Sequence, residues 1–194
     1  MEIIERKKEI INDCLELLVE KGLLGTTTRD LSKAMKLQSG GMYYYFSSKD
    51  DLIIACAEEA TQRMEKELIY PAMNEVFSPQ LMMDNLQKRA LTMAPTMKFF
   101  VSVCTDKRYE EKVKPLLERL GDRYNTYSNQ FAKIMSCDSK LISPYVYLLI
   151  TSISNYMIFE EISFVAPQIK AVQIKIERII ADGSEQNDIK KDGE

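Results

Sequence analysis

The sequence contains no histidine among its 194 residues, and this absence excludes several kinds of site. Ser-His-Asp and Cys-His nucleophile systems, imidazole ligands for zinc and a histidine pH switch all require that side chain. Cysteine is scarce as well, with four residues far apart and no CxxC pair: Cys14, Cys56, Cys104 and Cys137. This spacing favours reduced, buried thiols over a disulfide framework or a thiol sensor. We therefore expect no metal site and no cofactor.

Excess positive charge is also lacking. The formal net charge is −3, from 26 basic and 29 acidic residues, so any binding of nucleic acid must rest on a local patch. Hydrophobic residues make up 45% of the chain, which is enough for a substantial core. The first eight residues mix both charges and lack the apolar run of a signal peptide.

Residues 141–159 form the longest uncharged stretch, and they are numerous enough to span a bilayer as a helix. The stretch contains Pro144 and Asn155 together with several hydroxyl residues, and it is followed by two acidic residues rather than a basic cluster. These features favour a buried helix over a membrane span. We therefore expect a cytoplasmic protein.

The apolar residues recur with helical spacing throughout, and no strand pattern is present. In the first part of the chain, the pattern predicts a helix over residues 3–21 that ends at Gly22. A second helix follows Thr27, which forms a capping box with Asp30, and it runs to about residue 35. A third covers residues 39–45. A fourth is capped by Ser48, carries the chain towards residue 70 and closes at Pro71.

Prolines mark the expected helix limits in the rest of the chain. Pro79 begins a helix, Pro95 breaks it, and Pro167 precedes the last helix. Between them, one stripe predicts the inner face of a long helix: Val113, Leu117, Leu120, Tyr124, Tyr127, Phe131 and Ile134. The polar residues after position 181 are predicted to be disordered.

The segment from Thr26 to Lys49 carries the local positive patch. It holds four basic residues against one acid, within two short helices joined by a tight turn. Such a pair is the minimal unit that places a helix in the major groove of DNA. Hydroxyl groups and helix N-termini in the same segment add hydrogen-bond donors for phosphate.

The residues of this segment resemble the N-terminal signature of the TetR family of transcriptional regulators. The resemblance rests on these positions: Thr26-Thr27-x-Arg29-Asp30-Leu31, Leu37, Gly40-x-Met42-Tyr43-x-Tyr45-Phe46 and Ser48-Lys49-Asp50-x-Leu52. It implies an all-α fold of about nine helices. A three-helix helix-turn-helix domain would occupy residues 1–47, a ligand-binding and dimerisation domain residues 48–182, and the tail residues 183–194.

The resemblance also assigns the DNA-binding positions. It implies phosphate contacts from Thr27, Tyr43 and Lys49, and base contacts from the start of the third helix. The full candidate set is Thr27, Thr28, Arg29, Gln38, Ser39, Gly40, Gly41, Tyr43, Tyr44 and Lys49. For Tyr45 and Phe46 we expect core packing instead.

The segment departs from the family pattern at Lys36, at Gln38, where a serine cap is usual, and at Gly41, where threonine is usual. Lys36 stands where glycine is common, so a positive φ there would strain the backbone. The Gly40-Gly41 pair weakens a short helix, and it indicates either a close backbone approach to DNA or a soft helix ordered by its neighbours.

An apolar or aromatic effector, held by a few polar groups such as tyrosine hydroxyls, is the expected ligand of the second domain. Its candidate residues are Met93, Met97, Phe100, Tyr124, Tyr127 and Phe131, for each of which core packing is the alternative. The helices near residues 141–162 and 168–180 are the expected homodimer interface.

These features together favour a ligand-responsive regulator, most simply a repressor that a small molecule releases from a palindromic operator. The fourth helix, running to residue 70, would act as a lever between ligand and DNA. Two alternatives come from other classes: a helical-bundle enzyme acting on a small molecule, and an interaction module whose helix-turn-helix is purely structural. The absence of histidine argues against the enzyme.

Overall fold

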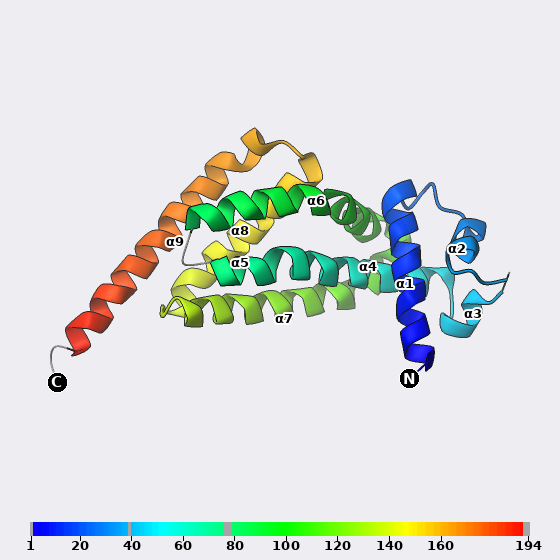
Figure 1. Ribbon diagram of the computed structural model, residues 1–194, viewed down its shortest axis with the longest axis horizontal. Helices are drawn as coiled ribbons and strands as arrows, with labels where there is room; N and C mark the ends of the chain where they lie inside the picture. The colour runs from blue at the N-terminus through cyan, green and yellow to red at the C-terminus, as the bar shows by residue number, and fades with distance from the viewer. Residues whose placement is uncertain (1, 39, 76–78, 192–194) are drawn as a thin grey trace. The chain divides into compact units, whose positions relative to one another are not determined.

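Every regular element in the described residues is a helix, which confirms the all-α class (Figure 1). The computed structural model describes residues 2–38, 40–75 and 79–191. The chain forms two units. Unit 1 comprises Met1–Lys66 and Pro95–Glu118, and unit 2 comprises Glu67–Ala94 and Arg119–Glu194.

Unit 1 begins with the predicted series of helices: α1 (Glu2–Lys21), α2 (Thr28–Ala34), α3 (Met42–Tyr45) and α4 (Lys49–Met64). Gly22 ends α1 in the left-handed conformation, with φ +77°, and its N–H donates to Leu18 O at 3.0 Å. The side chains of α1, α2 and α4 that are buried completely make up the core of this part: Ile10, Cys14, Leu15, Leu18, Leu31, Leu52, Ile53, Cys56, Ala57 and Ala60. Burial of these apolar faces stabilises helices that are too short to persist alone.

The third helix is shorter than the sequence predicts, with four residues instead of seven. Gly40 takes φ +97°, which is incompatible with a right-handed helix. The preceding residues form a turn instead, in which the Gly41 N–H donates to Gln38 O at 2.9 Å. The helix can therefore begin only at Met42.

The prediction that Pro71 closes the fourth helix was wrong. The α-helical pattern ends earlier, at Met64, and a π-helical turn, η1 (Glu65–Ile69), leads directly into α5 (Tyr70–Glu75). Pro71 is the second residue of α5. It lies at the junction where the hydrogen-bond pattern changes from π-helical to α-helical, and the hydrogen bond that it removes does not end the helix.

Pro95 and Pro167 also lie inside helices, contrary to the prediction. Pro95 is within α6 (Pro79–Thr105), and Pro167 is within α9 (Ile162–Lys191). A proline removes one hydrogen bond, but packing of the flanking turns can offset that loss. Beside the exposed Pro95, both Ala94 and Thr96 are buried.

The inner face of α7 (Glu110–Ile134) differs from the predicted stripe at two positions. Leu117 and Ile134 are 45% and 38% exposed, whereas the neighbouring Leu116 is fully buried. Residues three and four positions apart both lie near one face of a helix, so spacing alone does not choose between Leu116 and Leu117. The 3-10 turn η2 (Lys107–Tyr109) precedes α7.

In unit 2, α8 (Ser139–Phe159) packs against α9. Their shared core includes the end of α7, and its buried members are Phe131, Ala132, Met135, Ile142, Val146, Val172 and Ile176. By length and composition, α8 is the one helix within the described ranges that could cross a bilayer, yet six of its residues are buried in the fold. The core contacts favour the predicted role as a packed helix.

The C-terminal end of the chain continues α9 to Lys191. This helix enters the segment that the sequence predicts to be disordered. Residues 192–194 lie outside the described residues, and disorder of the tail stays a prediction.

Candidate functional site

A capping box fixes the start of α2, as the sequence predicts. The hydroxyl of Thr27 accepts from the Asp30 N–H at 3.2 Å, and the Asp30 carboxylate accepts from the Thr27 N–H at 3.0 Å. Hydrogen bonds from Thr27, together with one from Lys21, lower the pKa of Asp30 well below its usual range. The carboxylate is therefore charged at neutral pH and stabilises the N-terminal end of the helix dipole.

The end of α2 is a Schellman turn built on a strained residue. Lys36 takes φ +54°, its N–H donates to Lys33 O, and the Leu37 N–H donates to Ser32 O at 3.1 Å. Glycine usually occupies this left-handed position, because a side chain there costs energy. The sequence predicts a strained backbone if Lys36 takes a positive φ, and this is the φ observed.

The two glycines before α3 serve different purposes. Gly40 needs its backbone freedom rather than its small size, since its φ is +97° and an added Cβ would meet no atom within 4 Å. Gly41 needs its small size, because a Cβ there would lie 3.0 Å from Leu37 Cβ and 3.2 Å from Gln38 O. Close packing against the turn therefore accounts for Gly41 without a contact to DNA.

Most of the predicted DNA-binding residues are solvent-accessible on α2, α3 and the turn between them. Those exposed are Thr27, Thr28, Arg29, Gln38, Gly40, Tyr43 and Tyr44. Tyr43 and Tyr44 are 62% and 70% exposed, whereas Phe46 is buried as expected. Ser39 lies outside the described residues. Large exposed aromatic side chains on a helix of four residues are available to a partner.

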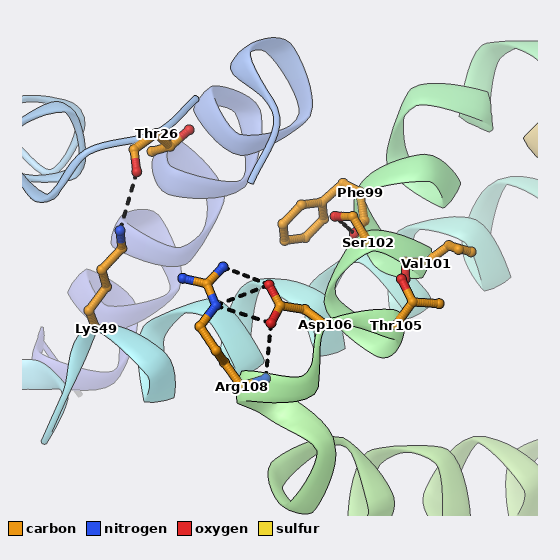
Figure 2. A network of polar contacts seen from close by, with 8 residues as sticks. All are labelled: Thr26, Lys49, Phe99, Val101, Ser102, Thr105, Asp106 and Arg108. Carbon is orange, nitrogen blue, oxygen red and sulfur yellow. Dashed lines mark hydrogen bonds and ion pairs between the residues drawn. The ribbon is translucent and has the colours of Figure 1, made fainter. Parts of the chain in front are cut away.

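Lys49 has a partner inside unit 1. Figure 2 shows its ammonium group reaching Thr26, whose carbonyl oxygen lies at 3.2 Å. The Thr26 hydroxyl in turn donates to Gly22 O at 2.8 Å. This chain of bonds ties the start of α4 to the turn between α1 and α2, a role that the sequence does not reveal.

Two further polar contacts lie near the start of α7. Arg108 forms a double hydrogen bond with the Asp106 carboxylate, which accepts from its guanidinium at 2.6 and 3.0 Å (Figure 2). Lys112 donates to Asp51 at 2.7 Å, close to the Ser48 cap of α4. The Lys112 bond holds the beginning of α7 against the beginning of α4 within unit 1.

The predicted ligand-binding residues divide between the two units. Met97 and Phe100 are buried in unit 1, whereas Met93, Tyr124, Tyr127 and Phe131 belong to unit 2. Phe131 is part of the α7–α8–α9 core, which favours the alternative of core packing for this residue. Met93 and Tyr124 are half-buried.

Unit 2 contains two pairs of contacting tyrosines and, in its described residues, one buried hydroxyl that lacks a hydrogen-bond partner. The hydroxyls of Tyr70 and Tyr127 lie 3.5 Å apart, and the rings of Tyr124 and Tyr147 meet edge to face at 6.2 Å between centroids. Next to Tyr127 in sequence, the buried hydroxyl of Ser128 has no hydrogen-bond partner among the described residues. An unpaired buried hydroxyl is costly, and a bound polar group would satisfy it.

The cysteines have the environment of structural residues. Burial raises the pKa of Cys14 to about 12 and that of Cys104 to about 11, and it raises the pKa of Cys56 as well. Thiolate is therefore scarce at neutral pH, and these thiols are poorly reactive. No group of side chains suited to a metal ion occurs in the part of the chain that the structure describes.

Residues 10–56 match the family of bacterial regulatory proteins known as the tetR family. This match confirms the resemblance and the helix-turn-helix assignment over these residues, and it favours a regulator over the enzyme alternative. The chain has no match among curated proteins.

One solved structure that the chain matches is the crystal structure of the multidrug binding protein EbrR complexed with imidazole. The identity is 14% and the TM-score 0.48, over 88% of this chain and 94% of that chain. A likeness at this level transfers no function.

Proposed function

We propose that the chain, which carries a tetR-family N-terminal domain, is a DNA-binding repressor that a small molecule releases from a palindromic operator. The observation that carries the proposal is the helix-turn-helix itself. The Thr27–Asp30 box caps α2, hydrogen bonds close the turn, and Tyr43 and Tyr44 extend from α3 into solvent. Since bacterial DNA lies in the cytoplasm, a cytoplasmic location is part of the proposal.

The proposed DNA contacts divide into two classes. Thr27, Tyr43 and Lys49 are assigned to phosphates, and Gln38, Ser39 and Tyr44 to base edges. The remaining candidates of the set contribute to the same surface. The Lys49 ammonium group has three N–H donors and uses one of them for Thr26 O. Its phosphate contact would be made by the others.

A homodimer is proposed because α8 and α9 each keep an apolar stripe in solvent. On α8, Leu141, Leu148 and Phe159 are 52–59% exposed and lie on one helical face with Pro144 and Thr151. On α9, the corresponding exposed residues are Phe164, Pro167, Ala171 and Ile174. Two such stripes suit a four-helix interface between copies. A dimer would also present two recognition helices to successive major grooves.

The proposed effector is apolar or aromatic with at least one hydrogen-bonding group. The tyrosine hydroxyls and the unpaired Ser128 hydroxyl support this chemistry within unit 2. The fourth helix, which the sequence predicts as a regular lever towards residue 70, changes to π-helical hydrogen bonding at η1. Binding of the effector would alter the path of the chain through this turn. A coupling of about 1–3 kcal/mol would change DNA affinity roughly 5- to 150-fold.

The decisive experiment measures the affinity of the full chain for the DNA upstream of its own coding region, against scrambled duplex, at several salt concentrations. We expect a preference for the upstream sequence and a steep fall in affinity with salt. Equal affinity for both duplexes would contradict sequence-specific regulation.

The phosphate assignments have their own test. Tyr43→Phe should weaken the upstream and scrambled duplexes by a similar factor, because a phosphate contact carries no sequence information. Loss confined to one sequence would instead place the Tyr43 hydroxyl on a base.

A further inference from the structure

The first turns of α1 contact both helices of the DNA-reading motif. Arg6 Nη2 donates to Met35 O at 2.8 Å, and Lys7 Nζ lies 4.9 Å from the ring centroid of Phe46. Met35 is the C-cap of α2, and Phe46 is the C-cap of α3. Adjacent residues of α1 therefore attach to the final residues of the two helices whose relative position determines DNA reading.

The hydrogen bond from Arg6 is made to the C-terminal end of α2. Carbonyl groups at the end of a helix lack partners within the helix, and a cation there also interacts favourably with the helix dipole. The next residue, Lys36, is the strained position of the turn, with φ +54°. At the other end of α2, Lys21 contacts the capping box through Asp30 at 3.1 Å. Two residues of α1 thus hold α2 at both of its ends.

The charge of Arg6 is already engaged. Its Nη1 donates to the Glu9 carboxylate at 2.8 Å while its Nη2 serves Met35, and the hydrogen bond with Glu9 raises the pKa of Arg6. A guanidinium paired with a carboxylate attracts phosphate less than a free one does. Lys8, the basic residue that follows Lys7, is exposed and offers a positive charge for comparison, without these contacts in the described structure.

We propose that Arg6 and Lys7 are positioning residues for DNA recognition: they hold the C-terminal ends of α2 and α3 and so set the pose of the recognition helix. The inference rests on the proposed DNA-binding function. Phosphate contacts tolerate small shifts of a helix, whereas base contacts do not. We call the contacts of Arg6 with Met35 and of Lys7 with Phe46 the clamp. Loss of the clamp should therefore reduce discrimination between DNA sequences more than it reduces general affinity for DNA.

The test compares Arg6→Ala and Lys7→Ala with Lys8→Ala in the full chain. The probes are the duplex that the wild-type protein selects from a random pool and a scrambled duplex of equal length. For Arg6→Ala we expect a loss of about tenfold on the selected duplex, little loss on the scrambled one and an unchanged salt slope. For Lys8→Ala, any loss should be equal on both duplexes.

A second measurement reports the stability of the turn after α2 in the absence of DNA. Amide hydrogen exchange at Leu37, whose N–H donates to Ser32 O, should accelerate in Arg6→Ala and stay unchanged in Lys8→Ala. Adding Lys36→Gly to Arg6→Ala should restore both slow exchange and discrimination, because glycine removes the strain that the clamp opposes.

Two results would overturn the inference. One is an equal loss on both duplexes with a salt slope reduced by about 0.9, which marks Arg6 as a phosphate contact. The other is unchanged Leu37 exchange in Arg6→Ala. Failure of the wild-type protein to select any duplex would overturn the proposed function instead, so the two failures are distinguishable.

Discussion

The α1–α3 region of unit 1 and the α8–α9 pair of unit 2 are stabilised by different kinds of contact. In α1–α3, helices of seven and four residues are held by directional bonds in addition to apolar burial, among them the Thr27 capping box and the Arg6 bond to Met35. In α8–α9, two helices longer than 20 residues share an apolar core. Hydrogen bonds determine orientation, whereas apolar burial supplies stability that depends little on direction. A surface that must match DNA therefore relies on polar clamps.

The largest effect is expected from the core of unit 2. Ile142→Ala removes a fully buried side chain from the α8–α9 core, and the lost burial plus the cavity should lower the free energy of unfolding by roughly 2–5 kcal/mol. Urea denaturation measures this change. Leu117→Ala is the control, because Leu117 is 45% exposed and should change stability by less than about 0.5 kcal/mol. Similar values for the two variants would contradict the assigned core.

The exposed stripe of α8 provides the next test. Leu148→Glu places a charge on the proposed interface, so the protein should become monomeric and lose about a hundredfold in operator affinity through the loss of bivalent binding. Sedimentation and DNA titration measure the two effects. Leu117→Glu, at a similarly exposed leucine of α7, should leave the dimer intact. A dimer that survives Leu148→Glu would place the interface elsewhere.

Removal of a single cap should have a smaller effect. Thr27→Ala abolishes the capping box of α2 and should reduce the free energy of unfolding by about 1 kcal/mol. Thr28→Ala is the matched control, since Thr28 is the first residue of the helix rather than its cap. Thermal or urea unfolding distinguishes them, and equal losses would show that the box does not hold α2.

Lys36→Gly should stabilise the protein. Lysine at φ +54° is strained, and glycine at the same φ is not, so a gain of up to roughly 1 kcal/mol is expected. The midpoint of urea unfolding measures the gain. A lower midpoint would mean that the lysine side chain contributes more to the fold than its backbone strain costs.

The weakest effect should depend on pH. The native pKa of Asp30 is lowered, so its contribution to stability is fully present above the unfolded value of about 3.9 and is lost as the pH falls through the native value. The difference in melting temperature between the wild type and Asp30→Asn should be greatest near neutral pH and shrink below about pH 4. A difference independent of pH would indicate that the charge of Asp30 is not involved.

Local contacts made much of the fold predictable. The caps at Thr27 and Ser48 and the end of α1 at Gly22 join residues three or four positions apart, and all are present. Prolines were misleading, because Pro71 and Pro95 remove a hydrogen bond without preventing the surrounding packing. The choice of Leu116 over Leu117 as a core residue depended on neighbours that helical spacing does not identify.

In the candidate site too, local features were predictable and contacts between distant residues were not. The sequence identifies the helix-turn-helix segment and its hydroxyl and aromatic residues, because the motif is contiguous. It does not reveal that Lys49 bonds to Thr26 or that Arg6 bonds to Met35, contacts that join residues 23 and 29 positions apart.

The sequence by itself determined the helical class, the caps and the helix-turn-helix, since each depends on residues close together in the chain. Tertiary structure decided how short α3 is, which face of α7 is buried and which basic side chains are engaged within unit 1. The physical reason is range. A cap needs only its own turn of helix, whereas a clamp or a core position needs a partner that only the folded chain brings near.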